Sequence, residues 1–122
     1  MGGVGKVFSK ILYIRIIRKY GCVIFPSAVV GKGFYITHPT GIVVGKCNIG
    51  EDFVIYQNCT IGTKNVGDGC PTIGDDVHLC TGSVLLGNIN IANHVYIGAC
   101  SLVIKDIKLP GVYGGNPLRK IK

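Results

Sequence analysis

The sequence contains no Trp and a single Met, and beyond Gly21 it has no stretch that suits a long amphipathic helix. Folds built on long helices are therefore excluded for most of the chain. Gly, in contrast, accounts for 19 of the 122 residues, and Val and Ile are frequent. This composition favours short strands joined by tight corners, and the length favours a single domain.

Targeting and metal-binding signals are missing as well. The apolar run from Ile11 to Ile17 is interrupted by Arg15 and is too short to span a bilayer, and no signal-peptide cleavage site follows it. The six cysteines form no C-x-x-C pair and match no metal-ligand spacing; they are Cys22, Cys47, Cys59, Cys70, Cys80 and Cys100. We therefore expect a cytoplasmic protein without a bound metal, in which these thiols are reduced and mostly buried.

Acidic residues are scarce, with 6 Asp and Glu against 13 Lys and Arg, which gives a net charge of +7. The basic residues gather at the two ends of the chain, whereas the middle is slightly acidic. A nucleic-acid-binding surface would also need interleaved aromatic residues or a known reading motif, and the sequence has neither. We therefore expect no nucleic-acid partner.

Aliphatic residues recur at every sixth position through the second half of the chain. The unbroken series is Ile73, Leu79, Leu85, Ile91, Ile97, Val103 and Leu109. A period of six fits neither an α-helix nor a simple alternating strand, and it is typical of a parallel β-helix made of hexapeptide repeats. Three units would close one triangular coil, with one branched residue per unit pointing into the interior. Stacked coils stabilise one another, so a globular core is not required.

Residues 1–20 are expected to form a basic amphipathic helix that ends at Gly21. The simpler interpretation is that this helix caps the first coil. The alternative is that its basic face also contacts an anionic membrane surface, which would place the protein at the periphery of the inner membrane. Residues 21–113 would then form the β-helix, and residues 114–122 a C-terminal tail.

The repeat is interrupted twice. The first interruption covers residues 37–41 and includes His38 and Pro39, and the second covers residues 63–71. Loops that leave a solenoid commonly carry its function, so we expect the chemistry at these two places.

Five segments carry a resemblance to a known family: HPTGIVVG at 38–45, PTIG at 71–74, LGNI at 86–89, IGA at 97–99 and GGNP at 114–117. From about residue 23 to residue 117 the sequence resembles the hexapeptide-repeat acyltransferases, whose fold is a left-handed β-helix, and it is most similar to the serine acetyltransferases. The resemblance implies a homotrimer, with acetyl-CoA as the cosubstrate lying between two subunits.

The resemblance also implies roles for single residues. His38 would be the general base, because a hydroxyl is a poor nucleophile until its proton is removed, and a His with a pKa of about 6.5 accepts that proton near neutral pH. The residues implied to contact the pantetheine arm are Gly62, Thr81 and Ala99. Arg119 and Lys120 would pair with the phosphates of the cosubstrate, or else belong to a solvated tail.

Departures from the family pattern affect the expected acceptor. Cys70 stands where serine acetyltransferases usually have a second His, Val23 where they have an acid, and Thr37 where Asp is common. Our candidates for acceptor binding are Thr37, Cys70 and Asp68. An ammonium group would need carboxylates near it. We therefore expect a neutral acceptor, a sugar hydroxyl of a capsule or lipopolysaccharide precursor. The alternatives are L-serine as the acceptor and a non-catalytic trimeric scaffold.

Further interpretations of the site stay open. Cys70 could be a nucleophile that forms an acetyl-enzyme. A zinc site is a second possibility, but the spacing of His38, His78 and His94 does not match one side of successive coils, and we interpret the latter two as exposed coil residues. The acids that could orient the His38 ring are Asp68, Glu51 and Asp52.

Overall fold

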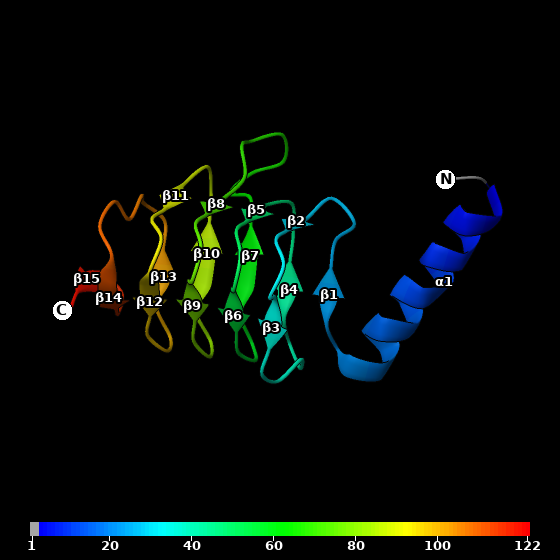
Figure 1. Cartoon of the computed structure of the whole chain (residues 1–122), viewed down its shortest axis with the longest axis horizontal. Helices are drawn as coiled ribbons and strands as arrows, with labels where there is room; N and C mark the ends of the chain where they lie inside the picture. Colours follow the sequence, from blue (N-terminus) through cyan, green and yellow to red (C-terminus); the bar gives the residue numbers. More distant parts are fainter. Residues whose placement is uncertain (1–2) are drawn as a thin grey trace.

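The computed structural model describes residues 3–122 and shows one helix followed by a solenoid of short parallel strands (Figure 1). Helix α1 is Gly3–Tyr20. The strands are β1 (Val23–Ile24), β2 (Val29–Val30), β3 (Tyr35–Ile36), β4 (Val43–Val44), β5 (Asn48–Ile49), β6 (Val54–Ile55), β7 (Thr60–Gly62), β8 (Thr72–Ile73), β9 (His78–Leu79), β10 (Val84–Leu86), β11 (Asn90–Ile91), β12 (Val95–Ile97), β13 (Leu102–Val103), β14 (Gly111–Gly114) and β15 (Arg119–Lys120).

The strands form three sheets, one on each side of the coil. Sheet A has the order β1-β4-β7-β10-β13, sheet B the order β11-β8-β5-β2, and sheet C the order β15-β14-β12-β9-β6-β3. Val84 pairs with Leu102, eighteen residues further along the chain, so one regular coil is three hexads long. The predicted all-β solenoid of hexapeptide repeats with an N-terminal helix is confirmed.

The interior of the solenoid is filled from two positions in each hexad. The predicted positions from Ile73 to Val103 are all buried. The residues four places further on are buried too; they are Val77, Ser83, Ile89, Val95, Ser101 and Ile107. The expectation of one inward residue per unit was therefore too low. Each fully buried aliphatic side chain contributes about 1.5–3 kcal/mol, so these columns supply most of the driving force for stacking.

The hexad register is wrong at its last position. Leu109 is 60% exposed, whereas Ile107 is 3% exposed and bridges to Ile91 in sheet B. Ile91 and Ile107 are sixteen residues apart, so the last coil is two residues shorter than the regular coil of eighteen residues. Both residues are aliphatic, so the sequence pattern is satisfied by either, and only the pairing with Ile91 selects Ile107.

Both predicted interruptions lie at edges of the solenoid. We call the edge where the chain passes from sheet C to sheet A the CA edge, and we name the AB and BC edges in the same way. The first interruption lies on the CA edge. The second, between β7 and β8, leaves the AB edge as a projecting loop of residues 63–71 (Figure 1). Thr60 pairs with Val84, twenty-four residues further along, so this coil is one hexad longer than a regular one.

Helix α1 extends away from the solenoid and does not cap its first coil (Figure 1). Val4 is 87% exposed and Phe8 63%, so the expectation of a capping helix is wrong for these side chains. In residues 3–122 no helix is both long and apolar enough to cross a membrane. The first two residues of the predicted helix lie outside the described residues.

The end of the chain folds back on the last coil. Residues 114–122, expected to form a tail, include β15, which pairs antiparallel with β14 through Tyr113 with Lys120 and Gly114 with Arg119. This hairpin extends sheet C by two strands beyond β12.

Candidate functional site

His38 lies in a two-residue insertion on the CA edge. Ile36 pairs with Ile55, and the amide of Asn58 donates to the carbonyl of Thr40, so Thr40 stacks on Gln57. Four positions separate Ile36 from Thr40, but only two separate Ile55 from Gln57. His38 and Pro39 are the extra residues. The insertion places the His38 side chain on the surface, where it is exposed.

The backbone around His38 is held at both ends. Thr37 donates its hydroxyl to the carbonyl of Ile55 at 3.1 Å, and the Gly41 amide donates to the carbonyl of Gly21 at 2.9 Å. Gly41 has a positive φ of 73°, and a Cβ there would collide with the Asn58 side chain. A side chain at this position would therefore displace the loop that carries His38. The hydroxyl of Thr37, a candidate for acceptor binding, serves this structural bond.

No carboxylate of the same chain approaches His38. Four of the six acids lie on the BC edge; they are Glu51, Asp52, Asp75 and Asp76. Asp68 lies in the loop on the AB edge, where Asn65 donates to its carboxylate at 2.9 Å. Throughout residues 3–122, no hydrogen bond or ion pair reaches the His38 ring. A carboxylate partner for His38 would have to come from another copy of the chain.

A column of four residues continues from the His38 insertion along the CA edge. The amides of Gly82 and Cys100 donate to the carbonyls of Gln57 and Thr81, so the column runs Thr40, Gln57, Thr81 and Ala99. Two candidates for the pantetheine arm, Thr81 and Ala99, therefore share one edge with His38. Strands in a sheet are about 4.8 Å apart, so Ala99 lies about 14 Å along the solenoid axis from the coil of His38.

Gln57 is a site residue that the sequence analysis missed. Its side-chain oxygen Oε1 is buried and, among the described residues, is the one buried side-chain nitrogen or oxygen without a hydrogen-bond partner. Its main-chain carbonyl accepts from the Thr81 hydroxyl at 3.1 Å. Leaving a buried acceptor unpaired costs about 1–3 kcal/mol, so the arrangement favours a bound donor at this point. No motif marks Gln57; its adjacency to Thr40 follows only from the stacking of coils.

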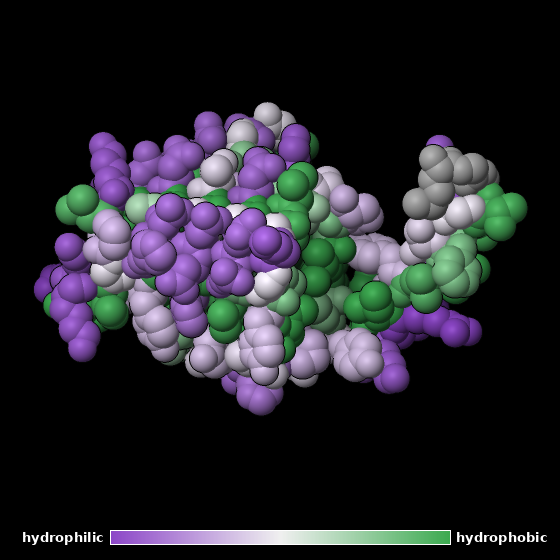
Figure 2. Space-filling model, viewed as in Figure 1, coloured by the Kyte–Doolittle hydropathy of each residue, from purple (hydrophilic) through white to green (hydrophobic). Residues whose placement is uncertain are grey.

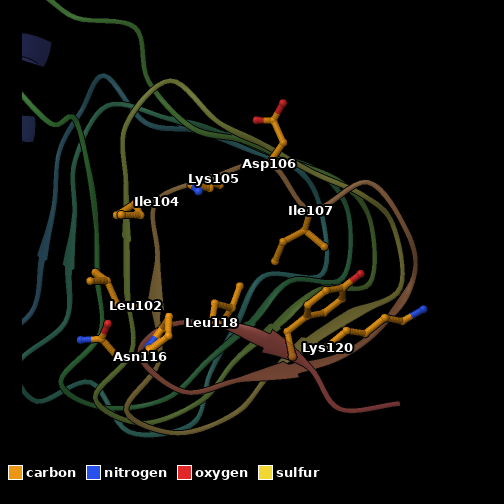
Figure 3. A pocket seen from close by; sticks show the side chains of 10 residues that line it. Leu102, Ile104, Lys105, Asp106, Ile107, Asn116, Leu118 and Lys120 are labelled. Carbon is orange, nitrogen blue, oxygen red and sulfur yellow. The ribbon is translucent and has the colours of Figure 1, made fainter.

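Arg119 and Lys120 lie at the C-terminal end, where only Arg119 continues this edge. Arg119 pairs with Gly114, and Gly114 stacks on Gly98, the residue before Ala99. Successive residues of a strand point to opposite sides, so Lys120 is directed elsewhere. Lys120 is one of the residues that line a cavity of about 370 Å³ at the open end of the last coil (Figure 3). The structure thus separates the two residues that were predicted to bind phosphates together.

The remaining candidates lie on the opposite side of sheet A. Gly62 ends β7, and Asp68 and Cys70 belong to the loop that follows it on the AB edge. Cys70 is half-buried, and the amide of Asn48 lies 4.0 Å from its sulfur. Within one chain, therefore, sheet A separates Cys70 and Asp68 from His38.

The outer face of sheet A is apolar between these two edges. Its outward positions are Val23, Phe25, Val43, Gly45, Thr60, Gly62, Val84, Leu86, Leu102 and Ile104. Thr60 is the single hydroxyl among them, and none is charged. Phe25, Val43 and Ile104 are exposed. Contiguous apolar surface of this kind is typical of an interaction face.

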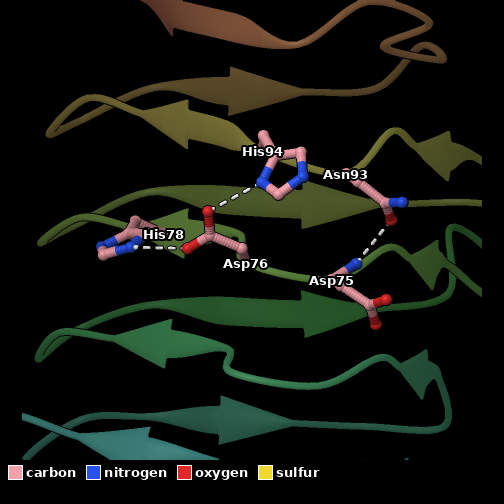
Figure 4. Close-up of polar contacts among 5 residues, drawn as sticks. All are labelled: Asp75, Asp76, His78, Asn93 and His94. Carbon is pink, nitrogen blue, oxygen red and sulfur yellow. Dashed lines mark hydrogen bonds and ion pairs between the residues drawn. The ribbon is translucent and has the colours of Figure 1, made fainter.

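His78 and His94 flank Asp76 (Figure 4). These residues lie on the BC edge, whereas His38 lies on the CA edge. The His94 Nδ1 lies 2.8 Å from one carboxylate oxygen of Asp76 and the His78 Nε2 3.5 Å from the other. The hydrogen bond from His94 keeps the pKa of Asp76 below its usual value. His78 is half-buried and stacks on Tyr96, so only His94 matches the expectation of an exposed residue. In residues 3–122 no three potential ligands converge in a way that could hold a metal ion.

Four of the six cysteines are buried, Cys70 is half-buried and Cys100 is exposed, and all six are free thiols. Burial, with a smaller contribution from Cys70, raises the pKa of Cys47 to about 11. The expectation of mostly buried thiols is confirmed.

The chain is similar to serine acetyltransferases in both sequence and structure, although no family model matches it. It is 43% identical over 90 residues to the serine acetyltransferase of Staphylococcus epidermidis, which covers 71% of this chain and 42% of that one. The crystal structure of serine acetyltransferase from Brucella abortus superposes with a TM-score of 0.88 at 32% identity, over 95% of this chain and 48% of that one. Soybean serine acetyltransferase complexed with serine superposes with a TM-score of 0.83 at 38% identity, over 90% and 46%. The chain spans less than half the length of these relatives.

Proposed function

Because this chain is a serine acetyltransferase-like hexapeptide-repeat protein, we propose that it transfers an acetyl group from acetyl-CoA to a hydroxyl group, with His38 as the general base. The observation that carries this proposal is the His38–Pro39 insertion. It puts an exposed imidazole at the start of an edge that continues through Gln57, Thr81 and Ala99 to Arg119. Five strand spacings of about 4.8 Å separate the two ends, so the edge is about 24 Å long and suits an extended thioester.

The reaction follows from this arrangement. The His38 ring takes the proton of the acceptor hydroxyl, and the oxygen attacks the thioester carbonyl. The carbon–sulfur bond then breaks, and the departing CoA thiolate takes the proton from His38. In this proposal Gln57 Oε1 accepts a hydrogen bond from the bound substrates, acetyl-CoA and its acceptor. The Arg119 guanidinium pairs with a phosphate of acetyl-CoA.

We propose a homotrimer in which a neighbouring copy completes each site. The apolar outer face of sheet A supports this proposal, because burying it between copies removes Phe25, Val43 and Ile104 from water. That face is bordered by His38 on one edge and by the loop 63–71 on the other. Packing copies through it would bring Asp68 and Cys70 of one subunit towards His38 of the next. Asp68 would then supply the carboxylate that His38 lacks in its own chain.

The favoured acceptor is L-serine, which the sequence analysis considered second to a sugar hydroxyl. The relatives are serine acetyltransferases, and one is complexed with serine. A sugar hydroxyl is the second candidate, because Thr37 and Cys70 are uncharged and four of the six acids lie on the BC edge.

The test measures CoA release from acetyl-CoA for the wild type, His38→Gln and His94→Gln. His94 is the matched control, because it is an exposed histidine on a different edge. Loss of a general base lowers kcat by about 10²–10⁴-fold, so His38→Gln should lose activity while His94→Gln keeps it. L-Serine and hexoses, free or nucleotide-linked, serve as acceptors. Equal loss in both variants, or none in His38→Gln, would reject His38 as the base.

A further inference from the structure

Helix α1 carries an apolar stripe on the side that faces away from the solenoid. The stripe consists of Val4, Val7, Phe8 and Ile11. Their spacing of i, i+3, i+4 and i+7 puts them on one face of the helix, and all four are exposed. Figure 2 shows apolar surface on the part of the helix farthest from the solenoid.

The opposite side of α1 faces the first coil. Lys6, Lys10 and Tyr13 line a cleft together with Pro26 of the solenoid. Tyr13 and Ile17 are half-buried, whereas most other residues of the helix are exposed. The side of α1 that carries Lys6, Lys10 and Tyr13 therefore faces the first coil, and the apolar stripe points outward.

The same helical face becomes basic towards the solenoid. Arg15 and Arg18 follow Ile11 at i+4 and i+7, and Lys19 adjoins them, so the three cations continue the line of the apolar stripe. Apolar side chains move to the other side in this second half. The polarity of α1 is therefore inverted between its halves, and the expectation of a single amphipathic face along the helix is wrong.

We propose that this face of α1 docks on an anionic lipid bilayer. The apolar stripe would enter the boundary between headgroups and acyl chains, and Arg15, Arg18 and Lys19 would contact lipid phosphates. The stripe from Val4 to Ile11 extends about 10 Å along the helix axis at a rise of 1.5 Å per residue, which is about two helical turns that can lie in the interface between headgroups and acyl chains. Lys6 and Lys10 lie on the opposite side and keep their charges in water.

The charge of α1 favours an anionic bilayer, and not a second copy of the helix, as the partner of this face. The helix holds five cations and no acid. Packing α1 against α1 along the whole of this face would oppose like charges in a parallel pair and would place cations on the apolar stripe in an antiparallel pair, whereas an anionic surface attracts each cation. The proposal concerns the surface of α1, which contains no residue of the candidate site, and it does not rest on the acetyltransferase activity.

Vesicle sedimentation tests the proposal on the whole chain. One set of vesicles contains phosphatidylglycerol mixed with phosphatidylcholine, and the other phosphatidylcholine alone. We expect binding to the anionic set that weakens with added salt, and much weaker binding to the neutral set. Replacing Arg15, Arg18 and Lys19 together by Gln should lower the binding constant about fivefold per residue, on the order of 100-fold in total.

Matched variants separate the stripe from a general charge effect. Val7→Ser with Phe8→Ser should abolish binding to anionic vesicles, whereas Lys6→Gln with Lys10→Gln should weaken it much less than the triple change. Circular dichroism confirms that α1 is retained in each variant. The proposal is overturned if the wild type does not bind anionic vesicles or binds neutral vesicles equally well. It is also overturned if the stripe change alters the mass of the assembly in solution and leaves lipid binding intact.

Discussion

Replacing Gln57 by Leu should stabilise the protein while it weakens the reaction. The side-chain oxygen of Gln57 is buried and unpaired, and its main-chain carbonyl, which accepts from the Thr81 hydroxyl, is unaffected by the change. Leu has a similar volume and carries no polar atom. The substitution therefore removes a desolvated acceptor without breaking a hydrogen bond that the fold uses.

The expected magnitudes have opposite signs. An unpaired buried acceptor costs about 1–3 kcal/mol, so the free energy of unfolding should rise by up to that amount. If Oε1 accepts a hydrogen bond from bound substrate, its loss should remove about 1 kcal/mol of transition-state binding, roughly a fivefold fall in kcat/KM. Thr81→Val is the control, because the Thr81 hydroxyl is already paired, and its loss should destabilise by about 0.5–1.5 kcal/mol.

Urea denaturation at one fixed protein concentration measures the stability changes, because assembly also shifts the midpoint. Acetyl transfer measured on the same preparations gives kcat/KM. A Gln57→Leu protein that is less stable than the wild type would show that the oxygen is paired in the folded state. A more stable protein with unchanged kcat/KM would show that the oxygen has no role in substrate binding.

Three further predictions follow from packing and titration. In urea denaturation, Ile107→Ala should lower the free energy of unfolding by about 2–5 kcal/mol and Leu109→Ala by less than about 0.5 kcal/mol. The reverse order would show that Leu109, and not Ile107, occupies the interior of the last coil. The pKa of Asp76 is lowered by its histidine neighbours, so its contribution to stability is present above about pH 4 and is lost as the pH falls through its folded pKa. Asp76→Asn should therefore lower the thermal midpoint near neutral pH, and a difference that persists at about pH 2 would contradict this linkage. Burial raises the pKa of Cys47 to about 11, so iodoacetamide at about pH 8 should alkylate the exposed Cys100 and leave Cys47 intact; equal labelling rates, read by mass spectrometry, would contradict its burial.

Periodicity and local chemistry made most of the fold predictable. A residue at every sixth position packs on its equivalent in the next coil, so the spacing from Ile73 to Val103 specified a solenoid before any contact was known. The two interruptions were predictable as well, because the hexad pattern is lost at residues 37–41 and 63–71 and the chain forms loops there. His38 stood out for the same reason, as the ionisable residue inside the first interruption.

The sequence pattern could not predict contacts between residues that are far apart in the chain. Ile107 and Leu109 suit the interior equally, and only the bridge to Ile91 selects Ile107. Nothing in the sequence distinguishes Gln57 from a surface amide; its place beside the His38 insertion and the burial of its side-chain oxygen follow only from the stacked coils.

Local sequence determines where short strands and loops occur, because steric and hydrophobic preferences act within one hexad. Whether two loops lie on the same edge of the solenoid depends on the number of residues in the coils between them. The alignment of His38, Thr81, Ala99 and Arg119 along one edge, and the separation of Cys70 from them by sheet A, are therefore properties of the stacked coils. The outward direction of the α1 stripe is decided in the same way, by the orientation in which the helix adjoins the first coil, with Lys6, Lys10 and Tyr13 turned towards Pro26.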